Sequence, residues 1–247
     1  MIKIAAIGDI HGTTKFLDCY ENIQKNDPDV DKIIVLGDWF DPYIEIDLDT
    51  MIDRYNEFVK IWKSDDRVIS ILGNHDIAGY IISNDYTNRT LRCGKMSQKI
   101  TDVIEPNLSE SYLTYKVGDY IFSHAGVSKD WLNEIRQFTY SSYNYDNYAD
   151  AIMDCKKGWT PDELSDICMF YPFDWSGCGE HSRQSCVWIR PHALINNAIE
   201  GYHQVVAHTR LQKISKVLLK NGKDLWIVDD EQKPNYLILN IEENVQN

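Results

Sequence analysis

The chain has 247 residues, of which 43% are hydrophobic and 26% charged, the ordinary balance of a globular protein. Its 38 acidic and 25 basic residues leave a net charge of −13, and this excess of negative charge argues against stable binding to a nucleic-acid backbone. No apolar run approaches the roughly 20 residues that cross a bilayer. An apolar strand pattern begins directly at the N-terminus and leaves no room for a signal peptide, so we expect a cytoplasmic protein that does not bind membranes.

The first third of the chain alternates strand and helix patterns. Short apolar runs predict strands at 2–7, 32–36 and 67–72. Apolar residues on one face predict helices between these strands, at 13–25 and 48–63. The resulting β-α-β-α-β order implies parallel strands that are joined by right-handed crossovers.

The later chain is richer in strands. A hairpin is predicted around Gly118-Asp119, from strands at 111–117 and 120–123. Further strands are predicted at 205–207, 214–219, 225–228 and 236–241, with a turn of the middle pair at Asn221-Gly222. We expect a single domain over residues 1–247, with an irregular insertion on the substrate side at about 131–190. The order of elements predicts an α/β fold of two packed mixed sheets flanked by helices.

Polar clusters directly follow five of these strands, at the point where each strand ends. The clusters are GDIHG at 8–12, GDWFD at 37–41, GNHD at 73–76, SHAG at 123–126 and AH at 207–208. Any one of them alone is more often a turn or a helix cap. Because ligands of α/β sheets bind beyond the carboxyl ends of the strands, we expect the five clusters to converge. Aspartate, asparagine and histidine together suit Mn²⁺, Fe or Zn²⁺, and the series therefore predicts a metal site.

This series of motifs resembles that of the calcineurin-like metallophosphoesterases. It is most similar to their phosphoprotein-phosphatase branch, including its small bacterial and phage members. The motifs extend from Asp9 to His208 in the family's order, and Thr209-Arg210 stands where the diesterase branches usually have a second histidine. The resemblance implies a four-layer α/β/β/α sandwich, the calcineurin-like phosphoesterase fold, and hydrolysis of phosphate esters.

The resemblance also implies two bound metal ions. Asp9 and His11 would bind the first ion, and Asp38 would bridge both ions. Three further residues would complete the second site, namely Asn74, His124 and His208. The ions, expected to be Mn²⁺ with Fe or Zn²⁺ as alternatives, would lower the pKa of a water held between them, so that the resulting hydroxide can attack phosphorus directly at neutral pH.

Two residues are implied as catalytic partners of the metals. His75 would protonate the leaving oxygen of the substrate. Asp41 would fix the tautomer of that imidazole and keep it charged. Asp76 is the weaker candidate for the orienting role, because a helix cap or a position behind the ligands explains this residue at least as well.

The expected phosphate-binding arginines depart from the family's pattern. The protein phosphatases usually have one arginine after the second aspartate of GDxxD and another before GNH, and here Pro42 and Leu72 occupy those positions. A guanidinium is the natural bidentate partner of phosphate oxygens. The nearest replacements are Arg190 and Arg183, of which we favour Arg190, although a salt bridge explains either one nearly as well. The missing arginines weaken the expectation of phosphoprotein substrates and leave the predicted metal ligands unaffected.

Three functions are consistent with these features of the sequence. The leading interpretation is a phosphate monoesterase that could act on phosphoserine or phosphothreonine in proteins. The alternatives are a hydrolase of nucleotides or dinucleoside polyphosphates, and an inactive, metal-stabilised binding protein. The expected partner is a small phosphorylated substrate or a phosphoprotein, without stable nucleic-acid or membrane binding, and the oligomeric state is left open.

Two other features are not assigned to the site. Cys178, His181 and Cys186 lack the spacing of a zinc knuckle, so the cysteines are expected to be free thiols in a loop on the substrate side. The Tyr-rich segment at 140–148 could stack a base or dock a partner, but packing over the sandwich is the simpler explanation.

Overall fold

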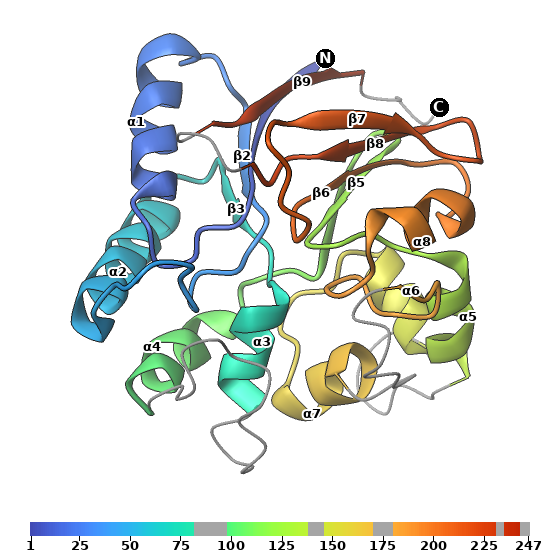
Figure 1. The fold of residues 1–247 in the computed structure, drawn as a ribbon, viewed down its shortest axis with the longest axis horizontal. Helices are drawn as coiled ribbons and strands as arrows, with labels where there is room; N and C mark the ends of the chain where they lie inside the picture. Colours follow the sequence, from blue (N-terminus) through green and yellow to red (C-terminus); the bar gives the residue numbers. More distant parts are fainter. Residues whose placement is uncertain (82–97, 138–145, 170–179, 231–234, 243–247) are drawn as a thin grey trace.

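The computed structural model describes residues 1–81, 98–137, 146–169, 180–230 and 235–242 (Figure 1). The first sheet has the strand order β3 (Val68–Ser70), β2 (Lys32–Val35), β1 (Ile2–Ile7) and β9 (Leu237–Ile241). The first three strands of the chain are parallel to one another, whereas β9 is antiparallel to β1. This arrangement confirms the predicted β-α-β-α-β unit.

The second sheet is also mixed. Its strand order is β4 (Thr114–Val117), β5 (Tyr120–Ser123), β6 (His203–Val206), β8 (Asp224–Ile227) and β7 (Ser215–Leu218). The three central strands are parallel, and both edge strands are antiparallel to their neighbours. The predicted hairpins turn at Gly118 and Gly222, which both have a positive φ.

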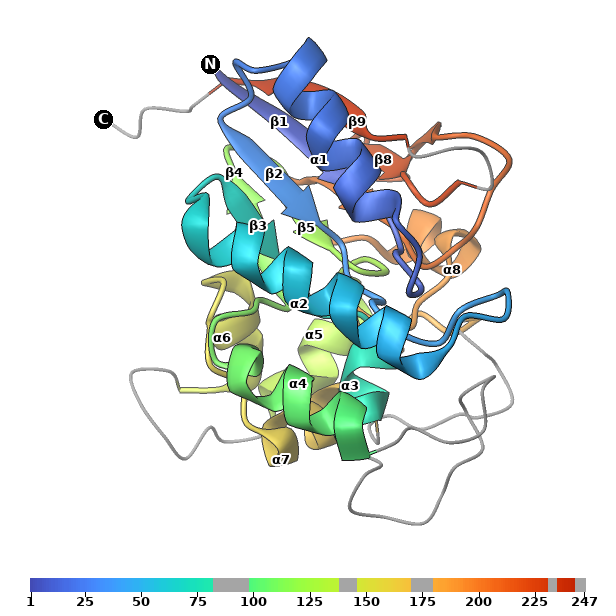
Figure 2. The same ribbon diagram turned by 90° about the vertical axis from the view of Figure 1, so that its left-hand side faces the viewer.

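Helices cover both outer faces of the paired sheets. The first sheet is covered by α1 (Lys15–Asn26) and α2 (Leu48–Ser64), which lie in front of its strands in Figure 2. The second sheet packs on α8 (Pro191–Asn197). The remaining helices lie below the strands in both views, and they are α3 (Asn74–Ile81), α4 (Gln98–Leu108), α5 (Lys129–Arg136), α6 (Tyr148–Met153) and α7 (Pro161–Leu164), which continues as the π-helix η2 (Ser165–Met169).

The alternation of side chains along the strands builds the layers. In β1, Ile4 and Ala6 belong to the apolar core between the two sheets, whereas Ala5 and Ile7 belong to the core under the helices. Both faces of this strand are buried, which is why it is almost continuously apolar. The order of layers is therefore helix, sheet, sheet, helix, as predicted.

The segment at 131–190 is less irregular than expected. Within this segment, which was predicted to be irregular, Thr160 and Glu163 form a reciprocal capping box that starts α7. Helices α3, α4 and α8 were not predicted either. Cys178 and the tyrosines at 140, 143 and 145 lie outside the described residues, and the division into one domain with an insertion stays a prediction. No helix in the described part of the chain is long and apolar enough to cross a membrane.

Candidate metal centre

The five polar clusters lie together at one edge of the two sheets. Asp9, Asp38 and Asn74 follow the parallel strands of the first sheet, and His124 and His208 follow those of the second. All of these side chains are buried. The carboxyl ends of parallel strands share one edge of a sheet, so stacking two such sheets brings their polar ends to one place.

The backbone at this edge adopts conformations that L-residues rarely accept. His11, Asp38, Asp41 and His208 have φ values of 46°, 54°, 66° and 59°, and Cys155 is the only other non-glycine residue with a positive φ in the described part of the chain. Each such residue costs on the order of 1–3 kcal/mol and persists only where its surroundings impose it. The sharp turns direct each side chain into the cluster directly after its strand ends.

Two glycines let neighbouring turns approach each other. Gly37 has a φ of +94°, and a Cβ at this position would collide with the backbone of Gly73. A Cβ on Gly73 would in turn collide with the carboxylate of Asp38. Glycine at both positions therefore allows Asp38 to lie against the start of α3.

One group of possible metal ligands consists of Asp9, His11 and Asp38. The Nδ1 of His11 donates a hydrogen bond of 3.0 Å to the carbonyl of Phe40, which directs Nε2 towards the carboxylates. This Nε2 lies 3.6 Å from Oδ2 of Asp9 and 3.8 Å from Oδ2 of Asp38. Such an orientation of an imidazole by a carbonyl is typical of metal-binding histidines.

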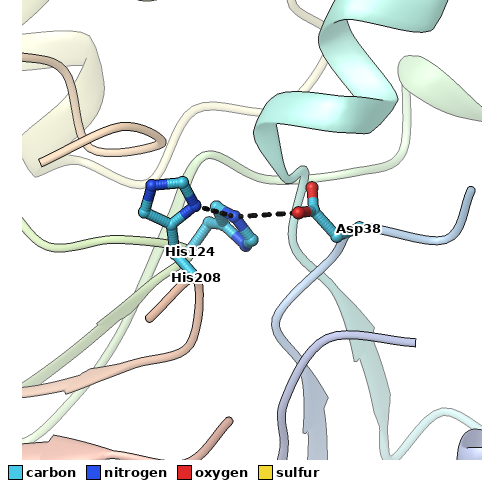
Figure 3. A group of neighbouring side chains, drawn as sticks. All are labelled: Asp38, His124 and His208. Atoms are coloured by element: carbon cyan, nitrogen blue, oxygen red, sulfur yellow. Dashed lines mark hydrogen bonds and ion pairs between the residues drawn. The ribbon is translucent and has the colours of Figure 1, made fainter. Parts of the chain in front are cut away.

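A second group shares Asp38 and adds His124 and His208 (Figure 3). The Nδ1 of His124 donates to the carbonyl of Leu36 at 2.7 Å, and its Nε2 lies 3.4 Å from Oδ2 of Asp38. The same Nε2 lies 2.9 Å from Oδ1 of Asn74 and 3.2 Å from Nδ1 of His208. The two groups contain five of the six residues predicted for the two ions, and Asn74 lies beside the second group through its contact with His124. Their roles as ligands remain a prediction.

Buried aspartates and histidines lie side by side in the cluster and shift one another's pKa values. Burial disfavours a charged carboxylate, but the nearby charges of His124 and His75 hold the pKa of Asp38 well below its usual value. Burial likewise opposes a charged imidazole at His124, yet Asp38 and Asp9 raise its pKa to about 10. Burial and the charge of His124 lower the pKa of His208. The carboxylates therefore retain their negative charge and require cations beside them.

These residues fit a pair of divalent metal ions. The Nε2 of His11 is buried and has no hydrogen-bond partner, although it faces two carboxylates. Imidazole nitrogens with carboxylate and amide oxygens suit Mn²⁺, Fe and Zn²⁺. A cation in each group would satisfy the nitrogen of His11 and balance the buried carboxylates, with Asp38 shared between the two sites.

His75 lies beside the cluster and belongs to neither group. Its Nδ1 is 3.0 Å from Oδ2 of Asp41, which is completely buried, and its Nε2 is 3.9 Å from Oδ2 of Asp38. Its backbone N–H donates to Oδ1 of Asp38 at 2.9 Å. The imidazole thus has a carboxylate at one nitrogen and the shared ligand near the other, which is the arrangement expected of an oriented proton donor.

Asp76 connects the turns of the centre. Its carboxylate accepts three backbone hydrogen bonds of 2.8–2.9 Å, from Asp38, Trp39 and Gly73. Burial and the charge of Asp38 raise its pKa to about 6. These contacts give Asp76 a positioning role behind the ligands. This is one of the roles considered from the sequence, as an alternative to orienting His75.

The two predicted arginines have different surroundings. Arg190 reaches the centre, where its Nη1 donates to the carbonyl of His208 at 2.7 Å and lies 3.2 Å from Oγ1 of Thr209. Arg183 is exposed and pairs with Glu134 of α5 at 3.3 Å. Arg190 therefore holds the turn at His208, and binding of substrate by either arginine remains a prediction.

Several residues that border the centre were not predicted from the sequence. Asp229 is buried near Asp9, which together with burial raises its pKa to about 7, and Lys15 lies 3.4 Å from it. The ring of Tyr43 packs edge-on against His11 with centroids 4.5 Å apart, and the guanidinium of Arg210 lies over Tyr43. None of these residues could be assigned from a motif, although Arg210 stands only two residues after His208.

The chain is similar to several solved structures. Among solved structures, the chain is similar to a protein serine/threonine phosphatase from Saccharomyces cerevisiae with similarity to human phosphatase PP5, at 16% identity and a TM-score of 0.48, over 92% of this chain and 67% of that one. It is also similar to a metallophosphoesterase from Sphaerobacter thermophilus, at 15% identity and a TM-score of 0.40, over 96% of this chain and 83% of that one. No curated protein matches the chain.

The family assignment comes from a family model. The model for calcineurin-like phosphoesterases matches residues 2–227, a range that contains every motif from Asp9 to His208. This family consists of hydrolases of phosphate esters that depend on two metal ions, and the two candidate ligand groups of this chain share Asp38 as such a centre requires. The chain therefore belongs to the calcineurin-like phosphoesterases.

Proposed function

We propose that this protein hydrolyses phosphate monoesters, with one metal ion held by Asp9, His11 and Asp38 and a second held by Asp38, Asn74, His124 and His208. The observation that supports this most directly is the pair of donor groups that share Asp38. A shared carboxylate brings two cations close enough to act on one phosphate group. Bound ions would supply Lewis-acid chemistry, polarising the phosphate and lowering the pKa of water.

The protein's own contribution begins with the rigidity of the ligands. His11 and His124 donate their Nδ1 protons to backbone carbonyls, so both rings keep one tautomer and one orientation. The carboxylate of Asp76 fixes the backbone of Asp38, because it accepts hydrogen bonds from the turn after β2 and from Gly73 in the turn after β3. A centre that is already organised needs little rearrangement when the substrate binds.

His75 is proposed to donate a proton to the leaving oxygen of the substrate. The carboxylate of Asp41 lies 3.0 Å from Nδ1 of His75 and orients the imidazole. The opposite nitrogen then carries the proton that can be transferred, on the side of the shared ligand Asp38. General acid catalysis of this kind contributes roughly 10²–10⁴ to the rate.

The substrate class is proposed as a phosphate monoester, with phosphoserine and phosphothreonine side chains among the candidates. The experiment is a panel of p-nitrophenyl phosphate, bis-p-nitrophenyl phosphate, a phosphopeptide and a dinucleoside polyphosphate, each assayed with Mn²⁺. We expect p-nitrophenyl phosphate to be hydrolysed and the diester to be a poor substrate. Metal content is measured on the same samples by elemental analysis, with two ions expected per chain.

Each alternative predicts a different result on this panel. Preferential cleavage of the dinucleoside polyphosphate would favour the nucleotide hydrolase. Two bound metal ions without hydrolysis of any substrate would favour the inactive binding protein. Efficient cleavage of the diester together with the monoester would overturn the assignment to monoesters.

A further inference from the structure

A stack of three side chains lies beside the metal centre, formed by His11, Tyr43 and Arg210. The rings of His11 and Tyr43 meet edge to face at 79°, with centroids 4.5 Å apart. The guanidinium carbon of Arg210 lies over the ring of Tyr43, 4.7 Å from the centroid of this ring. Two ring contacts thus connect an exposed arginine with a candidate metal ligand, although the three residues are far apart in the chain.

The backbone before and after Arg210 is anchored to the strands of the centre. The N–H of His208 donates to the carboxylate of Asp9 at 3.1 Å, and the N–H of Leu211 donates to the carbonyl of Asp229 at 3.0 Å. Between these anchors, the positive φ of His208 turns the chain, so that His208 is buried and Arg210 is exposed. The position of Arg210 is therefore set by the same backbone that positions a candidate ligand.

Because the centre is rich in negative charge, a phosphate ester would bind better if an accessible cation lay beside it. Carboxylates dominate the site, and an approaching phosphate ester would be repelled by them. Three other cations of the described residues contact the centre, and all three are half-buried. Lys15 contacts Asp229, Arg54 donates to the carbonyl of Gly12, and Arg190 donates to the carbonyl of His208. Arg210 is exposed and is therefore accessible to a ligand that arrives from solvent.

We propose that Arg210 binds the phosphate group of the substrate and that Tyr43 positions its guanidinium for this task. The proposal rests on the proposed function, because it names the residue that recognises the phosphate at the same site. Stacking on an aromatic ring uses the face of a guanidinium, whereas phosphate oxygens are bound by its N–H edge. Tyr43 can therefore hold Arg210 without competing for the phosphate.

The test measures binding of inorganic phosphate to the Mn²⁺-loaded protein by calorimetry, and the KM for p-nitrophenyl phosphate. Arg210→Gln should weaken phosphate binding about 10- to 100-fold, the loss expected for a hydrogen bond to a charged group. The matched control is Arg136→Gln, which removes the same charge from an exposed position near the end of α5 and should change phosphate binding less than about twofold. Mn²⁺ affinity, measured separately, should be the same in both variants.

Substitutions of Tyr43 test its positioning role. Tyr43→Phe keeps the aromatic ring and should retain phosphate affinity, whereas Tyr43→Leu removes the cation–π contact and should weaken phosphate binding about 2- to 5-fold. Equal losses in the two variants would assign the effect to the hydroxyl and overturn the stacking argument. Mn²⁺ affinity is measured here as well, because Tyr43 also contacts His11.

The outcomes separate this inference from the proposed function. Equal phosphate affinity in Arg210→Gln and Arg136→Gln would overturn the role of Arg210, and so would a loss of Mn²⁺ affinity that accounts for the whole change. A wild-type protein that binds phosphate through Arg210 but hydrolyses no monoester would contradict the proposed function and leave the role of Arg210 standing. Phosphate binding serves as the readout because it does not require turnover.

Discussion

Charged side chains gather at both ends of the parallel strands, but their surroundings differ. At the amino ends they form ion pairs that reach solvent, such as Lys3 with Asp29 at 2.7 Å and Lys223 with Asp119 at 2.7 Å. Pairs of this kind contribute little to stability, about 0–1 kcal/mol each. The backbone around them needs no left-handed residues other than glycine, and the side chains are free to adjust.

At the carboxyl ends the aspartates and histidines of the centre are buried and conformationally restrained. Asp38 is 1% exposed and His124 is fully buried, and four residues of the centre have a positive φ. Burying charges and straining the backbone both cost folding free energy. A protein retains such costs at one end of its sheets only where that end has a function, which is why the comparison points to the carboxyl ends independently of any motif.

The largest expected effect is that of Asp38→Asn, because it weakens both proposed metal sites together. Asparagine tolerates the left-handed φ of 54° at this position, so the fold should be retained. Turnover of p-nitrophenyl phosphate with Mn²⁺ should fall by several powers of ten. Asp119→Asn at the opposite end is the control and should leave turnover unchanged. If turnover of Asp38→Asn fell only a few-fold, the proposed bridging role of Asp38 would be contradicted.

His75→Asn should come next, with metal content retained and a loss of roughly 10²–10⁴ in turnover of alkyl phosphates. The loss should be smaller for p-nitrophenyl phosphate, whose leaving group barely needs a proton. Asp41→Asn should show a milder version of the same pattern, since it removes the group that orients the imidazole. Equal losses on both kinds of substrate, together with loss of metal, would show that His75 only shapes the site.

Asp76→Ala should affect stability more than chemistry. It leaves three buried backbone N–H groups without their acceptor, at a cost of about 3 kcal/mol or more. Urea unfolding of the metal-free protein measures this cost directly. Asp119→Ala, which removes an ion pair at the amino ends, should cost no more than about 1 kcal/mol. Comparable losses in the two variants would contradict the distinction between the two ends.

The smallest effect is expected for Asp65→Asn at the amino ends. Hydrogen bonds from Arg67 hold the pKa of Asp65 at about 2, below the usual 3.8. A lowered pKa in the folded state adds stability above the unfolded value, and this contribution is lost as the pH falls towards 2. The variant should therefore be less stable than wild type by about 0.5–1 kcal/mol at pH 7 and by progressively less between pH 4 and 2 in urea titrations. A difference that is constant over this range would exclude the ion pair as its cause.

Local patterns were sufficient to locate the strands and the polar clusters. The apolar run at Ile2–Ile7 is buried on both faces, and so its sequence alone marks it as a central strand. Asp9, Asp38 and His124 lie within three residues of the ends of their strands, and position after a strand is a property of the sequence itself. The parallel order of the strands then implies that these residues share an edge. Helix α7 was missed because it has only four residues, too few to show an apolar periodicity, and its one strong signal is the capping box of Thr160 and Glu163.

Contacts between distant segments were decided only by the tertiary structure. Asp76 receives hydrogen bonds from the turn after β2, and Arg210 reaches Tyr43 across the edge of both sheets. Arg190, which was predicted to bind substrate, lies at the centre and donates to the carbonyl of His208. Whether Arg190 or Arg210 faces solvent depends on how the turns around them pack. Spacing along the chain does not predict this packing. Sequence therefore determined which residue types meet at this edge, whereas tertiary packing decided which of them form the two candidate ligand groups, which hold the backbone and which face solvent.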